Sequence, residues 1–240
     1  MITQNNFYQA SQAGLEAKSL AKNFISNVFA WMGIALALTA FTAYYFASSP
    51  ELIGLLITET GMTILGWIVM LSPIGFVLAM SLGFQRFSVG TLTLLFGIYA
   101  ILMGASLSFI LLIYTAASIF QTFAVTAGMF GIMAVIGYTT KTDLTKFGSI
   151  MMMGVIGIVI ASLVNMFMKS QTFDYIISFV GVLIFTGLTA YDVQTLKKIG
   201  TGIEYGAEST RKLVILGALR LYLDFINLFL FLLRFLGDRK

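Results

Sequence analysis

Three ionisable residues stand within long apolar stretches near the C-terminus of the chain: Asp192, Arg220 and Asp224. A charged side chain at the centre of a bilayer costs at least ~2.5–3.5 kcal/mol, so such residues normally face a bundle interior or a watery cavity. Two carboxylates held close together away from water resist ionising at the same time and can share one proton. A short hydrogen bond would then hold the pair together, and loss of the proton would drive the two groups apart. Such a pair could act as a pH-dependent gate.

Helical spacing gathers other side chains around these charges. In the later stretch, five residues at steps of three and four share one helix face: Gly217, Arg220, Asp224, Asn227 and Phe231. In the earlier stretch, Thr189 shares a face with Asp192, and Tyr191 directly precedes the aspartate. The spacing makes Asp192 and Asp224 the candidate ion pathway and pH gate. The supporting polar groups would be Thr189, Tyr191 and Asn227.

Arg220 is the candidate charge partner in this set. One helical turn separates it from Asp224, and a pair between those two would form a neutral packing element instead of a gate. Asp192 lies ~7.5 Å, and Asp224 ~16 Å, from the same basic end of their helices. The two carboxylates could therefore meet across consecutive antiparallel helices only with an offset in depth.

The composition indicates that lipid surrounds these helices. Apolar residues make up 59% of the 240 residues, against ~45–50% in soluble chains. Charged residues make up 10%, whereas a water-facing surface needs roughly 25–35%. The net charge of +4 is better explained by membrane orientation than by a nucleic-acid partner.

Two residue types are missing from the chain, cysteine and histidine. Their absence excludes disulfides, thiolate metal sites, a cysteine nucleophile, Ser-His catalysis and histidine zinc sites. Histidine is also the side chain that ordinarily titrates between pH 5 and 8. A physiological response to pH would therefore come from the aspartates.

Seven apolar runs are long enough to cross a bilayer. They cover residues 24–47, 62–82, 89–114, 118–139, 147–168, 173–196 and 213–236. Their connections are short, which predicts one seven-helix transmembrane domain over residues 24–236. A polar cytoplasmic tail, 1–23, would precede it and a short tail, 237–240, would follow. The fold class is therefore predicted to be all-α, a polytopic membrane protein built as a seven-transmembrane-helix bundle.

Basic residues near the span ends predict the orientation. With the N-terminus inside, the cytoplasmic side collects nine of them: Lys18, Lys22, Arg86, Lys141, Lys146, Lys197, Lys198, Arg211 and Lys212. The opposite side collects four: Lys169, Arg234, Arg239 and Lys240. This asymmetry favours a cytoplasmic N-terminus and an outside C-terminus.

Small residues one turn apart predict close helix packing. Three such pairs are Gly33 with Ala37, Gly104 with Ser108, and Gly157 with Ala161.

Two stretches resemble the terminal signatures of the Bax inhibitor (transmembrane Bax-inhibitor-motif) family. They are residues 188–194, LTAYDVQ, and residues 221–229, LYLDFINLF. The loop at residues 138–146, YTTKTDLTK, resembles that of bacterial members. The similarity runs from about residue 24 to residue 236.

The resemblance implies a bundle in which a central C-terminal helix is wrapped by the other six. It also implies a pH-sensitive calcium leak in a bacterial cell (inner) membrane, gated by the aspartates corresponding to Asp192 and Asp224. Bacterial relatives carry an arginine in the second helix that latches to the sixth-helix aspartate. Here residues 62–82 contain no arginine, and the nearest is Arg86. Our hypothesis is that Arg220 takes that place from the seventh helix.

Calcium would be the transported ion, with no resident cofactor and no enzymatic activity. Calcium prefers 6–8 oxygen ligands, and the core offers few beyond Asp192, Asp224 and their polar neighbours. A weak, transient calcium site at the two aspartates suits permeation, because ions must leave as readily as they enter.

Two alternatives remain open. The first is an intramembrane aspartyl protease, since Tyr191-Asp192 resembles its first motif and a proton-sharing pair is the required chemistry. Asp224, however, does not follow Gly-x-Gly, and a Pro-Ala-Leu motif is missing. The second is a regulator of membrane-protein turnover or stress survival that acts by binding a membrane-protein partner.

Overall fold

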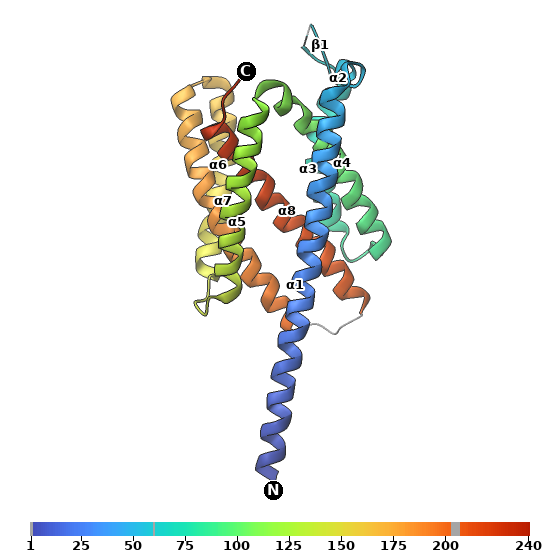
Figure 1. The fold of residues 1–240 in the computed structure, drawn as a ribbon, viewed down its shortest axis with the longest axis vertical. Helices are drawn as coiled ribbons and strands as arrows, with labels where there is room; N and C mark the ends of the chain where they lie inside the picture. Colours follow the sequence, from blue (N-terminus) through green and yellow to red (C-terminus); the bar gives the residue numbers. More distant parts are fainter. Residues whose placement is uncertain (1, 60, 203–206) are drawn as a thin grey trace.

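The computed structural model describes residues 2–59, 61–202 and 207–240, with side chains from Ser19 onward. The described residues form eight helices and one small hairpin (Figure 1). The helices are α1 (Ile2–Ser48), α2 (Pro50–Leu56), α3 (Ile64–Gly83), α4 (Val89–Ile113), α5 (Ala116–Thr139), α6 (Thr145–Met168), α7 (Gln171–Thr201) and α8 (Glu208–Leu236). Seven are long and apolar enough to cross a membrane, and each overlaps a predicted span. The predicted all-α, seven-span architecture is confirmed.

Polar side chains mark where the spanning helices begin. Four helices start after a serine or threonine whose hydroxyl accepts a hydrogen bond from the backbone N–H three residues later: Thr63, Ser88, Thr115 and Ser170. Such caps satisfy backbone donors that have no partner inside the helix. Helix α6 ends at Lys169, which adopts a left-handed conformation with φ of 51°. These caps explain why the long apolar runs break into separate helices.

The segments outside the membrane spans also form helix or hairpin where the structure describes them. Helix α1 begins at Ile2 and its membrane part at Ser19, so helix runs through most of the predicted tail. Met1 and the side chains of residues 1–18, including Lys18 of the orientation prediction, lie outside the described residues, as do residues 203–206. After α2, strand β1 (Ile57–Thr58) pairs with β2 (Gly61–Met62) in an antiparallel hairpin.

The C-terminal tail forms a bridge to the junction of α4 and α5. The backbone N–H of Thr115 donates to the carbonyl of Asp238 at 3.1 Å, and that of Lys240 donates to the carbonyl of Ile113 at 2.9 Å. The backbone N–H of Asp238 donates to the Ser118 hydroxyl at 2.9 Å. The predicted tail 237–240 is therefore fixed to the bundle.

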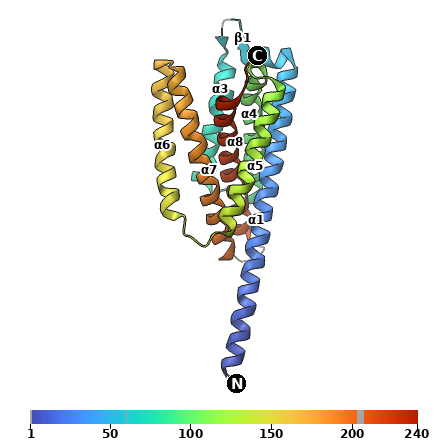
Figure 2. The same ribbon diagram turned by 60° about the vertical axis from the view of Figure 1, so that its left-hand side comes forward.

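Helix α8 occupies the centre of the bundle. In its most apolar stretch 67% of residues are buried, against 11% in α6. It packs mainly against α1, α4, α5 and α7, while α6 packs on the outer side of α7 (Figure 2). The central position of the last helix agrees with the prediction, but four helices supply most of its contacts.

The two ends of the bundle carry different connections. The N-terminal part of α1 and the loop between α5 and α6 lie at one end, together with the end of α7 and the beginning of α8 (Figure 1). We call this the N-terminal end. The hairpin and the C-terminus lie at the other, which we call the C-terminal end.

Close helix approach depends on only some of the predicted glycines. A Cβ at Gly104 would lie 2.6 Å from the carbonyl oxygen of Thr39, so this glycine lets α4 meet α1. A Cβ at Gly33 or Gly157 would have nothing within 4 Å, and the packing predicted for those two positions is wrong. Gly137 of α5, by contrast, packs directly on the backbone carbonyl of Ala190 in α7.

Candidate functional site

The two predicted aspartates meet between α7 and α8. Asp192 of α7 is 3% exposed and Asp224 of α8 is 5% exposed. Their carboxyl groups lie within hydrogen-bonding reach of each other. The offset in depth expected from the sequence therefore does not keep the two groups apart.

The carboxyl pair lacks a donor for part of its surface. Among the described residues, Asp192 Oδ1 and Asp224 Oδ2 are buried side-chain oxygens without a hydrogen-bond partner. Two ionised carboxylates cannot bond to each other, because each is only an acceptor. A single proton on either carboxyl would supply the missing donor. One proton shared by the two carboxyls would satisfy this arrangement.

Arg220 completes the charged cluster from α8. Its Nε donates to Asp192 Oδ2 in an ion pair that joins α8 to α7. Its guanidinium carbon also lies 5.5 Å from the centre of the Tyr191 ring, in a cation–π contact. The structure thus pairs Arg220 with Asp192, not with Asp224 one turn away. This is the arrangement expected if Arg220 takes the place of a second-helix arginine, and α3 itself contains none.

The remaining predicted residues lie around the cluster at different depths. The Thr189 hydroxyl donates to the carbonyl of Phe185 at 2.8 Å, within its own helix. The Asn227 amide donates to the carbonyl of Leu223 at 2.8 Å. Of the three supporting groups, Tyr191 is therefore the one with a contact to the charges. The residues predicted to share one face of α8 differ in burial. Asp224 is buried, whereas Arg220 and Asn227 are only half-buried.

A buried tyrosine pair lies beside α8 and was not predicted. The Thr39 hydroxyl donates to the carbonyl of Ala100 at 2.9 Å, and the Tyr222 hydroxyl lies 2.7 Å from the same threonine oxygen. The ring centres of Tyr99 and Tyr222 are 5.4 Å apart, and the Tyr99 hydroxyl has no partner in the described part of the chain. Tyr222 stands inside the signature LYLDFINLF, which was the available signal, whereas Tyr99 had none.

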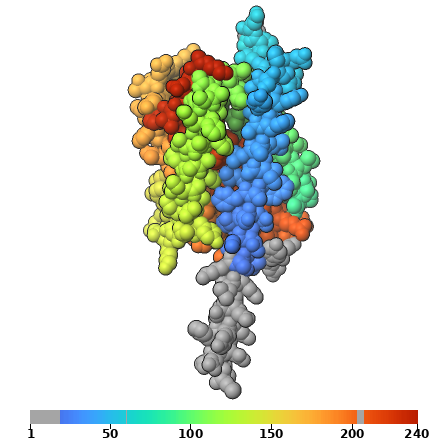
Figure 3. All heavy atoms as spheres, in the orientation of Figure 1, coloured from blue at the N-terminus to red at the C-terminus, as the bar shows by residue number. Residues whose placement is uncertain are grey.

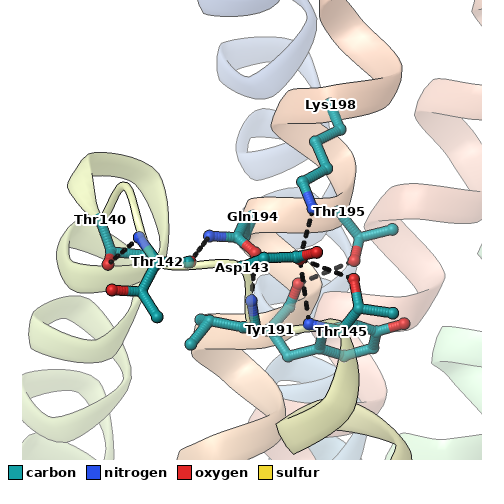
Figure 4. Close-up of polar contacts among 9 residues, drawn as sticks. Thr140, Thr142, Asp143, Thr145, Tyr191, Gln194, Thr195 and Lys198 are labelled. Carbon is teal, nitrogen blue, oxygen red and sulfur yellow. Dashed lines mark hydrogen bonds and ion pairs between the residues drawn. The ribbon is translucent and has the colours of Figure 1, made fainter.

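The loop between α5 and α6 holds α7 through Gln194 (Figure 4), and we call this contact the Gln194 clamp. Gln194 lies two residues after Asp192. The Gln194 side chain donates to the carbonyl of Thr142 at 2.8 Å and accepts from the backbone N–H of Leu144 at 2.9 Å. The Lys197 ammonium donates to the carbonyl of Tyr138 at 2.7 Å. These bonds fix α7 within two turns of Asp192.

An exposed ion pair extends the same clamp. Asp143 Oδ1 lies 2.7 Å from Lys198 Nζ and accepts from both the hydroxyl and the backbone N–H of Thr145 (Figure 4). The hydrogen bonds from Lys198 and then Thr145 lower the pKa of the Asp143 carboxyl to about 2. Asp143 therefore stays ionised at any physiological pH.

In the part of the chain that the structure describes, no third acidic side chain joins the carboxyl pair to form a metal-binding group. Within the described ranges, no group of three or more histidine, cysteine, aspartate or glutamate side chains could hold a metal ion. Two carboxyls supply far fewer than the 6–8 oxygens of a tight calcium site. At most this arrangement could bind calcium weakly and briefly.

A separate cavity of about 580 Å³ lies between α1, α5 and α7. Its helices α1 and α5 form the face seen in Figure 3. Val193 reaches its wall, and the lining is mainly apolar, with Lys22, Ser26 and Tyr138 as the members that carry polar groups. Since it contains neither aspartate, we place the candidate site at the carboxyl pair and not in this larger space.

Several known proteins are similar in sequence to this chain over almost its whole length. Residues 21–240 match the family described as the inhibitor of apoptosis-promoting Bax1. The chain is 45% identical over 234 residues to the inner membrane protein YbhL of Escherichia coli (strain K12), covering 97% of this chain and 99% of that relative. It is 47% identical over 222 residues to a protein of Borreliella burgdorferi, covering 92% and 94%. It is 43% identical over 219 residues to protein RP147 of Rickettsia prowazekii, covering 91% of each chain. The signatures around the two aspartates were therefore read correctly, and the chain belongs to the Bax1-inhibitor family.

Proposed function

We propose that this protein is a pH-sensitive, calcium-permeable leak of the bacterial inner membrane, gated by Asp192 and Asp224. The observation that carries the proposal is the buried carboxyl pair, in which one oxygen of each group lacks a hydrogen-bond donor among the described residues. Intramembrane ionisable residues that face a bundle interior commonly mark ion pathways and proton relays.

The gate works through one proton. With a proton between them, the two carboxyls attract each other and hold α7 against α8. After the proton leaves, two negative charges at close range in a medium of low dielectric repel each other strongly. Arg220 compensates Asp192 but makes no direct ion pair with Asp224, so it moderates the repulsion without removing it. Calcium flux should therefore rise as pH rises.

The released pair also supplies the attraction for the ion. Two carboxylates with Arg220 nearby hold calcium too weakly to trap it, and a conducting site must let ions leave as well as enter. The partners in this proposal are the lipid bilayer and the calcium ion.

The localisation and orientation follow from the relative and from the charges. YbhL is an inner membrane protein, and basic residues are more frequent at the N-terminal end of the bundle than at the C-terminal end. We therefore place the N-terminus in the cytoplasm and the C-terminus outside.

The decisive experiment is calcium flux into proteoliposomes between pH 6 and pH 8. Asp192→Asn and Asp224→Asn should each change the flux and flatten its pH dependence, because an amide cannot titrate. Asp174→Asn is the matched control, since Asp174 pairs with Arg234 at 3.2 Å near the C-terminal end of the bundle. Unchanged flux in both gate variants would refute the proposal and favour a regulator that acts through a membrane-protein partner.

The alternative function raised by the sequence is that the same carboxyl pair is the catalytic dyad of an intramembrane protease. Arg220 occupies Asp192 Oδ2, which leaves fewer free carboxylate oxygens than a catalytic dyad uses, and we therefore propose no enzymatic role. Cleavage of a helical reporter in liposomes that is lost in Asp192→Asn would contradict this view.

A further inference from the structure

One face of α8 borders two cavities on the side of α3. The first, of about 390 Å³, is lined by Arg220 of α8 and Ser81 of α3 among apolar neighbours. The second, of about 300 Å³, is lined by Asn227 of α8 and by Tyr99 of α4. We call them the Arg220 cavity and the Asn227 cavity. The first lies toward the N-terminal end of the bundle and the second toward the C-terminal end.

Two apolar residues line both cavities: Val77 of α3 and Leu223 of α8. Leu223 lies three residues after Arg220 and four before Asn227, so the three side chains follow one another along one face of α8. Val77 faces them from α3. The two cavities therefore meet at a position bordered by hydrocarbon alone on these two helices.

Each cavity contains polar groups suited to water. The Arg220 side chain is 38% exposed although it stands deep in a spanning helix. In the Asn227 cavity, the Asn227 side chain is half-buried and its amide donates to the carbonyl of Leu223. Buried polar groups are nearly always hydrogen-bonded to protein or water, and each cavity far exceeds the ~30 Å³ that one water occupies. Each cavity therefore combines a mostly apolar lining with a polar group from α8 and has room for water.

We propose that Val77 and Leu223 form an apolar barrier that separates two hydrated chambers of the ion pathway. Hydrophobic constrictions in channels block conduction because water leaves them, and ions then cannot cross. This inference rests on the proposed function and adds a second closure to it. Neither aspartate lines these two cavities, and the aspartate pair acts on the Arg220 cavity through the ion pair between Asp192 and Arg220. The barrier controls whether water connects that cavity to the Asn227 cavity.

The first experiment makes the barrier polar while keeping its shape. Val77→Thr replaces one methyl group by a hydroxyl of similar size, and calcium flux at pH 6 should rise on the order of tenfold. Leu223→Asn should act in the same direction. Val164→Thr is the matched control, because Val164 is 46% exposed on α6 and faces away from the core. Unchanged flux in both barrier variants would overturn the proposal.

A second experiment measures hydration without calcium. The chain has no cysteine, so Leu216→Cys probes the Arg220 cavity and Leu230→Cys probes the Asn227 cavity. A membrane-impermeant thiol reagent should label each from one side of the liposome only, and from opposite sides, because only a hydrated thiol forms the reactive thiolate. With Val77→Thr added, Leu230→Cys should become reactive from both sides. Val164→Cys should stay unlabelled.

The two readouts separate the barrier from the calcium proposal. Opposite-sided labelling without any calcium flux would support the barrier and refute the calcium leak. Aspartate variants that alter flux, together with Val77→Thr leaving both flux and labelling unchanged, would refute the barrier alone. Failure of both probes to react would mean that lipid fills the cavities, and it would refute the barrier.

Discussion

The two sides of α8 differ in how closely other helices pack around Arg220 and the aspartates. We call the side against α7 the α7 flank and the side against α3 the α3 flank. On the α7 flank, the ion pair between Arg220 and Asp192 is reinforced by the Gln194 clamp, and α5 packs behind α7 through Gly137. On the α3 flank, two cavities border α8, and α3 packs mainly on α4. The helices that bury the carboxyl pair are therefore different from the helix, α3, that borders the open space beside Arg220. A closely packed framework sets the carboxyl geometry, and an open flank leaves room for water.

The largest effect is expected from a substitution that disrupts the close packing of α5 on α7. Gly137→Ala places a Cβ against the backbone carbonyl of Ala190, which cannot move aside as a flexible side chain can. We expect a loss of about 3 kcal/mol in the free energy of unfolding, at the upper end of typical overpacking costs. Thermal unfolding in detergent measures it. Gly128→Ala on the same helix, where a Cβ would meet nothing within 4 Å, should leave the melting temperature unchanged, and equal effects would contradict the argument.

A smaller loss in the free energy of unfolding is expected when the ion pair between Arg220 of α8 and Asp192 of α7 is removed. Arg220→Ala leaves the Asp192 carboxylate buried without its ion partner. Breaking a fully buried pair costs about 3–5 kcal/mol, and because Arg220 is partly exposed we expect about 2 kcal/mol. Protonation of the orphaned carboxyl should recover part of this, so the loss in melting temperature should be greater at pH 8 than at pH 5. A pH-independent loss would indicate that Arg220 acts through packing alone.

The clamp can be tested with a single atom change. Gln194→Glu keeps an oxygen for the backbone N–H of Leu144 but replaces the donor to the Thr142 carbonyl by a second acceptor. The expected cost is about 1 kcal/mol for one lost hydrogen bond. Hydrogen exchange of the α5–α6 loop should accelerate while exchange in α3 does not change. Faster exchange in α3 would mean that the two flanks are not independent.

The smallest effect is expected at the exposed end of the clamp. The pKa of Asp143, at about 2, lies below its ordinary value of 3.8. Its ionised form therefore stabilises the fold above about pH 4, and this contribution disappears as pH falls toward 2. Asp143→Asn should lower the melting temperature slightly at neutral pH, and the wild-type and variant curves should converge near pH 2. Curves that stay parallel across this range would contradict the assignment.

The sequence predicted the spans and identified the two aspartates that lie buried between α7 and α8, because both features depend on local signals. Long apolar runs fix helix length, and a carboxylate inside such a run stands out at once. The partner of Arg220 was left undecided, since spacing along α8 favours Asp224 whereas the observed choice of Asp192 depends on how α7 lies beside α8. The position of the proposed barrier also depends on how the helices pack, and the sequence alone does not indicate it. Val77 is one ordinary valine among many in α3, and only the positions of the two cavities single it out.

The bridge between the C-terminal tail and the α4–α5 junction fixes the outer end of α8, so any tilt of this helix would turn about that end. Backbone bonds from Asp238 and Lys240 hold its outer end, so α8 cannot slide along its axis without breaking them. Asp224 lies twelve residues before Leu236, where α8 ends, a distance of about 18 Å along the helix. A tilt of only about 5° around the bridge would move the Asp224 backbone by about 2 Å, enough to separate two carboxyls that share a proton.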